Sequence, residues 1–160
     1  MNFYQLIDTL KQLTEGNDLT NKITFGELSD VNLSKDDTFP LLHMMVEEAV
    51  IEERTIDYRI VVVAADMVDH IDEDLGLEDF YGNDNTQDVL NTQFAVVNGL
   101  QSALRRGELF SDLYQIDTDY TANLFEDRFE NLLAGWSLNI SITVANNQIS
   151  DINANGQSAC

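Results

Sequence analysis

Chemically reactive residues are scarce in this chain. The 160 residues include one cysteine, Cys160, so no disulfide can form within the chain and no cysteine-based metal site is expected. Only two histidines are present, whereas zinc usually takes roughly three or four protein ligands. The sequence also has no Gly-x-Ser-x-Gly segment, no Ser-His-Asp spacing and no glycine-rich phosphate loop. We therefore expect a protein that is not an enzyme and that holds no cofactor.

Positive charge is also scarce. Eight lysines and arginines stand against twenty-nine aspartates and glutamates, which gives a formal net charge of -21. Such a surface repels phosphate, so we do not expect the chain to bind nucleic acid through basic side chains. No run of about 18 apolar residues is present, so we expect no membrane contact. The hydrophobic content of 44% and the length predict one domain with a buried core.

Hydrophobic spacing predicts a helix at each of two places. Apolar residues at spacings of three and four predict an amphipathic helix over 3–13, and not a signal peptide, with Gly16 at its end. A second stripe predicts the main helix over 86–106. Asp84 and Gln87 resemble a capping box for this helix, and Gly107 is expected to stop it. The residues of the second stripe are Leu90, Phe94, Val97, Leu100 and Leu104.

Strands are predicted from β-branched residues and from alternation. The segments 41–53 and 55–68 are expected to form a long hairpin around a charged turn, although helix is an alternative for 41–53. The near-continuous apolar run in the second of them predicts a central strand. Apolar and polar residues alternate cleanly over 136–144, and a short strand is expected within 22–28.

The element order predicts an α+β fold. We expect an antiparallel sheet of about four strands with a long β-hairpin, and helices packed on one face. Residues 1–145 should form one domain, and the polar residues 146–160 a flexible tail. The segment 108–135 is left open, because Phe125, Phe129 and Leu132 have helical spacing but the segment could also be an extended excursion with one helical turn.

Carboxylates gather after the apolar run. A calcium loop needs acids at its first, third and fifth positions and glycine at its sixth, but a loop that starts at Asp72 has Gly76 at its fifth. His70 and its acidic neighbours make only a weak metal motif, so structural roles are favoured for His43 and His70. A solvated loop is therefore the favoured interpretation of the nine acids within 66–88: Asp66, Asp69, Asp72, Glu73, Asp74, Glu78, Asp79, Asp84 and Asp88.

The few cations suggest where subunits could meet. In an oligomer of so acidic a chain, arginines could contact the acids of a neighbour, and interfaces favour arginine and aromatic residues at their centres. The paired Glu47 and Glu48 are expected to point to opposite faces of their strand, so that they would not converge on one substrate. The predicted interface residues are Glu52, Glu53, Arg54, Thr55, Arg59, Arg105 and Arg106.

Three stretches carry a resemblance to a known group of proteins. They are TIDYRIVVVAADMVD, NTQDVLNTQFAVVNGLQSALRRGEL and FENLLAGWSLNISITV. Their order after an N-terminal helix resembles the tail-terminator and head–tail connector ring proteins of tailed bacteriophages. With the acidic, cysteine-poor, single-domain composition, the chain is also similar to neck ring proteins of crAss-like phages. The likeness spans residues 1–145 and rests on element order and sequence texture.

The resemblance implies a structural role in a virion. Such proteins form closed rings, commonly of six or twelve copies, at the head–tail junction or at the end of the tail tube. They contact portal-side and tail proteins after assembly in the host cytoplasm, and DNA passes through them without specific binding. They have no catalytic residues. Their long hairpin, here around Glu52–Thr55, often reaches toward a neighbouring subunit or ring, and 108–135 could serve as an interface arm or brace.

If the chain forms a ring, some of its acidic residues are expected to line or rim the DNA channel. An acidic wall would repel the DNA backbone, so DNA could move without breaking contacts. Solubility of the free subunit explains the acids equally well. The alternative function is a soluble acidic module that binds calcium or a cationic partner. The acids expected to line or rim the channel are Glu47, Glu48, Asp69, Asp72, Glu73 and Asp74.

Overall fold

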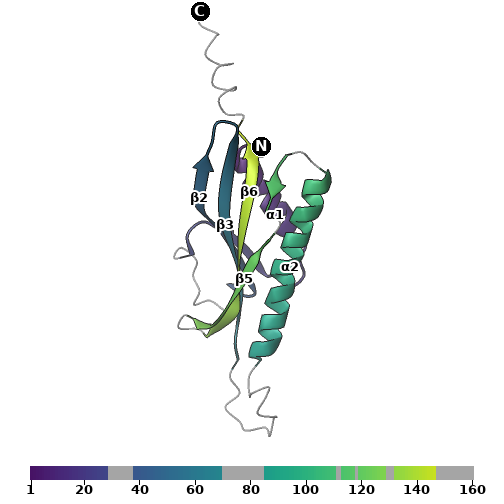
Figure 1. Cartoon of the computed structure of the whole chain (residues 1–160). Helices are drawn as coiled ribbons and strands as arrows, with labels where there is room; N and C mark the ends of the chain where they lie inside the picture. The colour runs from purple at the N-terminus through teal and green to yellow at the C-terminus, as the bar shows by residue number, and fades with distance from the viewer. Residues whose placement is uncertain (29–37, 70–84, 111–112, 118, 129–131, 147–160) are drawn as a thin grey trace, which may run out of the picture.

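A computed structural model describes residues 1–28, 38–69, 85–110, 113–117, 119–128 and 132–146 (Figure 1). The helices and strands follow one another along the chain in the order helix, three strands, helix, three strands. They are α1 (Phe3–Thr14), β1 (Lys22–Phe25), β2 (Leu41–Ile51), β3 (Thr55–Met67), α2 (Thr86–Phe110), β4 (Gln115–Ile116), β5 (Thr121–Arg128) and β6 (Leu133–Ala145).

All the strands belong to one mixed sheet. Their order is β1-β2-β3-β6-β4, and β5 also pairs with β6. The predicted α+β class, the long hairpin and the central position of the third strand are confirmed. The prediction of about four antiparallel strands is wrong in its detail, because the sheet has six strands and β1 runs parallel to β2.

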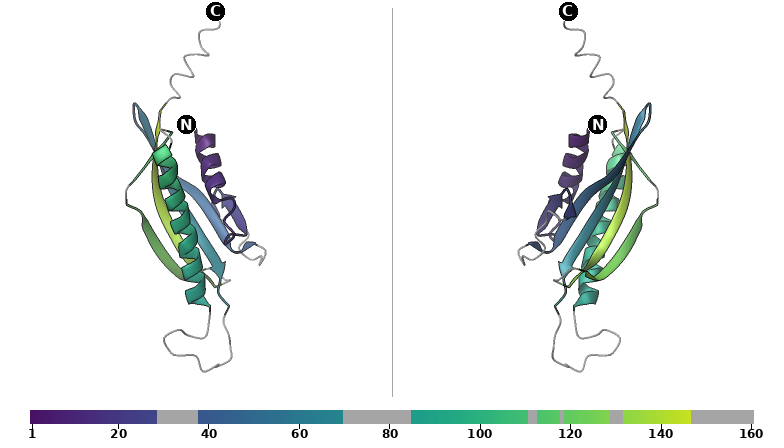
Figure 2. Two further views of the ribbon diagram at one scale, coloured as in Figure 1. Left: turned by 90° about the vertical axis from the view of Figure 1, so that its right-hand side faces the viewer. Right: turned by 90° about the vertical axis from the view of Figure 1, so that its left-hand side faces the viewer.

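Both helices pack on the same face of the sheet (Figure 2). Leu6 and Leu10 of α1 share one core with alternate residues of the central strands and with four residues of α2: Val96, Val97, Leu100 and Leu104. The capping box of α1 is formed by Asn2 and Gln5, each accepting from the other's backbone N–H at 2.9 Å. The opposite face of the sheet carries a smaller apolar cluster at one end, which includes Leu41, Val63, Ala65, Phe125 and Leu133.

The main helix does not stop where the sequence predicted. It continues through Gly107 to Phe110, because this glycine makes room for a side chain and does not end the helix. A Cβ at Gly107 would lie 2.1 Å from the hydroxyl oxygen of Tyr114, which donates to the carbonyl of Leu104 at 3.0 Å. Asp84 of the predicted capping box lies outside the described residues.

Beyond the end of α2, the described residues of the segment 108–135 include two strands and no helix. The helical alternative is wrong in the described part of it, because β4 and β5 both pair with β6. Ladder hydrogen bonds and burial against the neighbouring strand outweigh a local apolar spacing. Phe125, which had suggested the helix, is 9% exposed within β5, and Phe129 lies outside the described residues.

A β-bulge changes the direction of one acidic side chain. On β2, Val46 pairs with Ile60 and Glu48 pairs with the next residue of β3, Arg59, so that Glu47 is the extra residue. Both glutamates therefore lie on the face away from the helices. The prediction that they alternate between faces is wrong, because a bulge shifts the two-residue period by one.

Candidate functional site

The face of the sheet opposite the helices is acidic in the half that lies next to the hairpin between β2 and β3. Its outward carboxylates come from β2, from β3 and from the segment around β4, and they surround a single arginine, Arg59. A hollow of about 380 Å³ is lined by three of these carboxylates, those of Glu47, Asp117 and Asp119, and by Asn139 and Ser141 of β6. The acids of this surface, which we call the open face, are Glu47, Glu48, Asp57, Asp117 and Asp119.

Local contacts neutralise little of this charge. The Arg59 guanidinium pairs with the Glu48 carboxylate at 2.5 Å, but both side chains are more than half exposed, so the pair adds little stability. The hydroxyl of Thr143 donates to the Asp57 carboxylate. Five carboxylates and one guanidinium thus leave the open face strongly negative, which favours a role in repelling anions or in attracting cations.

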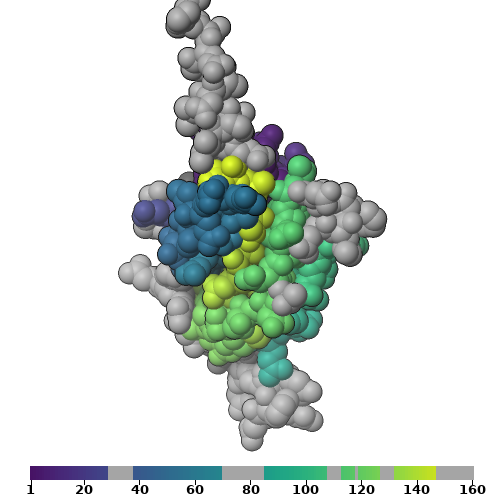
Figure 3. All heavy atoms as spheres, turned by 45° about the horizontal axis from the view of Figure 1, so that its top comes forward, coloured from purple at the N-terminus to yellow at the C-terminus, as the bar shows by residue number. Residues whose placement is uncertain are grey.

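The hairpin tip is held in place by the end of β6. The backbone N–H of Asn146 donates to the Arg54 carbonyl at 2.8 Å, and its side-chain amide donates to the Glu52 carbonyl at 2.9 Å. Within the turn, the Thr55 hydroxyl donates to the Glu52 carboxylate at 3.2 Å. Figure 3 shows the hairpin and the end of β6 side by side. Four of the predicted interface residues, 52–55, therefore form a braced tip.

The other predicted site residues are not gathered at this tip. Arg105 and Arg106 lie on α2, where Arg106 donates to the Ser102 carbonyl and the Arg105 guanidinium lies 5.1 Å above the Tyr120 ring. Asp69 follows β3 at the end of the sheet away from the hairpin, about 40 Å from the tip. Asp72, Glu73 and Asp74 of the predicted channel lining lie outside the described residues.

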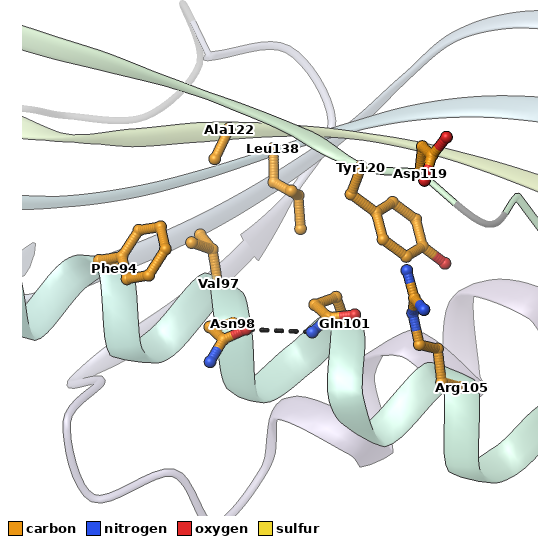
Figure 4. A pocket seen from close by; sticks show the side chains of 9 residues that line it. All are labelled: Phe94, Val97, Asn98, Gln101, Arg105, Asp119, Tyr120, Ala122 and Leu138. Atoms are coloured by element: carbon orange, nitrogen blue, oxygen red, sulfur yellow. Dashed lines mark hydrogen bonds between the residues drawn. The ribbon is translucent and has the colours of Figure 1, made fainter.

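A second hollow, of about 440 Å³, lies between α2 and β5 (Figure 4). The sequence had placed Phe94 in the core stripe, but its side chain is 45% exposed and stacks edge-on against Trp136 at 5.1 Å. The expectation fails because α2 covers β3 and β6 and leaves β5 largely uncovered. We call this surface the edge hollow; it is lined by Phe94, Val97, Asn98, Gln101, Arg105, Asp119, Tyr120, Ala122 and Leu138.

His43 has the structural role that the sequence favoured. It is fully buried, accepts from the Thr24 hydroxyl at 2.8 Å through Nδ1, and donates to the Gly26 carbonyl at 3.0 Å through Nε2. These two partners suit the neutral ring. Burial lowers the pKa of His43, and the hydrogen bond to Gly26 opposes this only in part.

The lowered pKa of His43 sets a direction for stability. The unfolded chain binds a proton near pH 6.5 that the folded chain resists, so His43 should contribute full stability above that pH and lose it as the pH falls below. NMR should show the His43 ring titrating below pH 6.5, with its signal identified by its absence in His43→Gln. Titration at or above pH 6.5 would contradict this environment.

The pKa of Asp66, near the end of β3 that lies away from the hairpin, is raised, whereas that of His43 is lowered. Burial raises the pKa of its carboxyl group, the charge of Asp69 adds to this, and the Met67 N–H that donates to it at 2.8 Å opposes it. The ionised form therefore costs stability as the pH rises through the folded-state pKa. Neither Asp66 nor His43 lines one of the two hollows, and burial is the largest cause of the pKa shift of each.

Gln93 is a buried polar residue with an unfulfilled hydrogen-bonding group. It is 1% exposed on the core side of α2, and its side-chain nitrogen has no hydrogen-bond partner among the residues that the structure describes. Replacing it by leucine should raise the free energy of unfolding by about 1 kcal/mol, because an unpaired buried N–H₂ group is removed. Urea denaturation would measure this. The exposed Asn91→Leu on the same helix is the control, and a loss of stability in Gln93→Leu would contradict the assignment.

The described part of the chain holds no group of three or more histidine, cysteine, aspartate or glutamate side chains placed to bind a metal ion. None of its helices is long and apolar enough to cross a membrane. Comparison with known families and with curated proteins found no family model and no relative that matches this sequence.

Proposed function

We propose that this chain is a structural subunit of a ring in the neck or at the end of the tail tube of a tailed bacteriophage, surrounding the channel through which DNA passes. The ring would be built from copies of the chain, commonly six or twelve in such assemblies, and would contact portal-side and tail proteins. It would assemble in the host cytoplasm and remain at the head–tail junction of the virion.

The observation that carries the proposal is the contrast between the two faces of the sheet. One face is buried under α1 and α2, and the other bears the five carboxylates of the open face. A wall with helices outside and carboxylates inside suits a DNA channel, because it offers no cationic contacts that would have to be broken as the phosphate backbone moves. Glu47 and Glu48 would line this channel, and the braced tip at 52–55 would form its rim or meet a neighbour.

Electron microscopy of assembled protein would test the orientation. In a Cys160→Ser background, a gold label on Glu47→Cys should lie at the central hole, whereas a label on Asn91→Cys, on the exposed side of α2, should lie at the outer rim. Labels from Glu47→Cys at the outer rim would contradict the proposed channel lining.

A second candidate function is an acidic module for a cationic partner. The bulge favours it, because it brings Glu47 and Glu48 to one face around Arg59. A ligand that binds only the folded chain raises its melting temperature. Under the ring proposal calcium should leave the melting temperature unchanged, and a rise with millimolar calcium would favour the module.

A further inference from the structure

We propose that β1 of one copy pairs with β5 of the next, so that the sheet continues from subunit to subunit and the edge hollow is filled by Phe25 of the neighbour. This inference rests on the proposed ring and names its contact. It starts from the two edges of the sheet: among the described residues, neither β1 nor β5 has a strand on its outer side. Open strand edges are ready-made sites for pairing with another chain.

The two edges lie at the same level of the sheet. Following the pairings across it, Thr24 is in register with His43, Val63, Ser137 and finally Asn123 of β5. A second copy placed beside the first therefore meets it without a shift along the strands. A contact between two different surfaces closes into a ring when it adds only a rotation that divides a full turn, whereas a contact that adds translation gives a filament.

The strand directions also match. β1 is parallel to β2, β2 and β6 are each antiparallel to β3, and β5 is antiparallel to β6. Two copies in the same orientation thus bring β1 and β5 together as an antiparallel pair, the arrangement that the rest of this sheet uses.

The side chains at the two edges complement each other. Phe25 is 46% exposed on the face of the sheet that the helices cover. The paired residues that cross the sheet from Phe25 end at Ala122 of β5. Ala122 lines the edge hollow together with the exposed Phe94. In the next row Ile23 would lie beside Leu124, which is also 46% exposed. Pairing in register would remove these apolar surfaces from water together.

Charge favours the same partner. The outer edge of β1 carries the exposed Lys22, and the row of Lys22 across the sheet ends at Phe125 of β5, next to the exposed Glu126. The remaining open stretch of β2 is protected, because it holds the bulge and the acids Glu47 and Glu48, features that discourage edge pairing. The contact is thereby confined to β1.

Disulfide trapping tests the register. In a Cys160→Ser background, Thr24→Cys with Asn123→Cys should oxidise to a ladder of covalent multiples of 18.1 kDa on non-reducing gels, because directly opposed residues of antiparallel strands are within disulfide reach. The matched control is Thr24→Cys with Gln115→Cys. Gln115 is on the same edge and face, but it pairs with Thr143 and not Ser137, about 20 Å along the strands, and should not cross-link.

The native mass, measured in parallel, separates the outcomes. Dimers from Asn123→Cys alone would mean that two β5 strands pair about a two-fold axis, which overturns the inference. A particle of ring mass without the ladder would place the contact elsewhere and leave the proposed ring standing. A chain that stays monomeric, with no ladder, would overturn both.

Side-chain substitutions give a second, independent test. Phe25→Ser and Phe94→Ser should each weaken assembly roughly tenfold or more, because each removes an aromatic side chain that becomes buried on pairing. The free subunit should stay folded, because each side chain is nearly half exposed and its loss removes one aromatic contact within the subunit, that of Phe25 with Phe3 or of Phe94 with Trp136. Leu113→Ser is the control, because Leu113 is 57% exposed but lies against α1. Assembly that is unchanged in both phenylalanine variants would contradict the contact.

Discussion

Gly135→Ala should lower the free energy of unfolding by about 3 kcal/mol, a large part of the roughly 5–15 kcal/mol of a typical domain. Gly135 lies on β6, paired with Ala65 of β3 and with Phe125 of β5. A Cβ there would lie 2.0 Å from the carbonyl oxygen of Ala64 and 2.9 Å from its carbonyl carbon. These are backbone atoms of the central strand, so two strands would have to separate before the methyl group could fit.

The expected loss runs against the usual preference of strands. Glycine within a strand normally costs stability relative to alanine, so a site without close contacts would gain from the change. Urea denaturation of Gly135→Ala and of Ser137→Ala, two residues further along β6, separates the effects, because Ser137→Ala should change stability by less than about 1 kcal/mol. A Gly135→Ala protein as stable as the parent would show that β3 and β6 do not approach so closely.

Gly107→Ala should destabilise the chain by about 2 kcal/mol although alanine is the better helix former. The new methyl group would displace the Tyr114 hydroxyl, which is buried and donates to the Leu104 carbonyl. Gly99→Ala on the same helix is the matched control. No atom outside the local helix backbone lies within 4 Å of a Cβ at Gly99, so that change should stabilise by about 0.5–1 kcal/mol.

A double-mutant cycle assigns the loss to the hydroxyl group. Tyr114→Phe alone should cost about 1 kcal/mol through the lost hydrogen bond. The double variant Gly107→Ala/Tyr114→Phe lacks the hydroxyl oxygen that is nearest to the new Cβ. Its loss of stability should therefore be smaller than the sum of the losses in the two single variants. Strict additivity would contradict a clash between these two groups.

Sequence patterns predicted the helices and strands whose hydrophobic pattern lies within a single segment of the chain. The stripes of α1 and α2 and the alternation within β6 each extend over nine or more residues, so burial on one face is visible in the sequence, and β-branched residues mark the hairpin. Pairing between distant segments was not visible. The parallel direction of β1 depends on where the chain returns before β2, and β5 is a strand because β6 lies beside it, although Phe125 and Leu132 have helical spacing.

The sequence likewise predicted some features of the candidate site and not others. Composition predicted a surface that repels phosphate, and Glu47 and Glu48 lie on such a surface. Their common direction comes from a bulge in the pairing with β3, which no period within β2 reveals. The edge hollow was missed because Phe94 falls in the apolar stripe of α2, and its exposure depends on how far the helix extends over β5.

The mass of the native particle in solution tests the central claim most directly. Sedimentation of the full chain over a range of concentrations, with and without calcium, should give a closed multiple of 18.1 kDa, six or twelve copies, that does not depend on calcium. A protein that remains a monomer at every concentration, or that associates only when calcium is added, would contradict the account of this chain as a subunit of a ring.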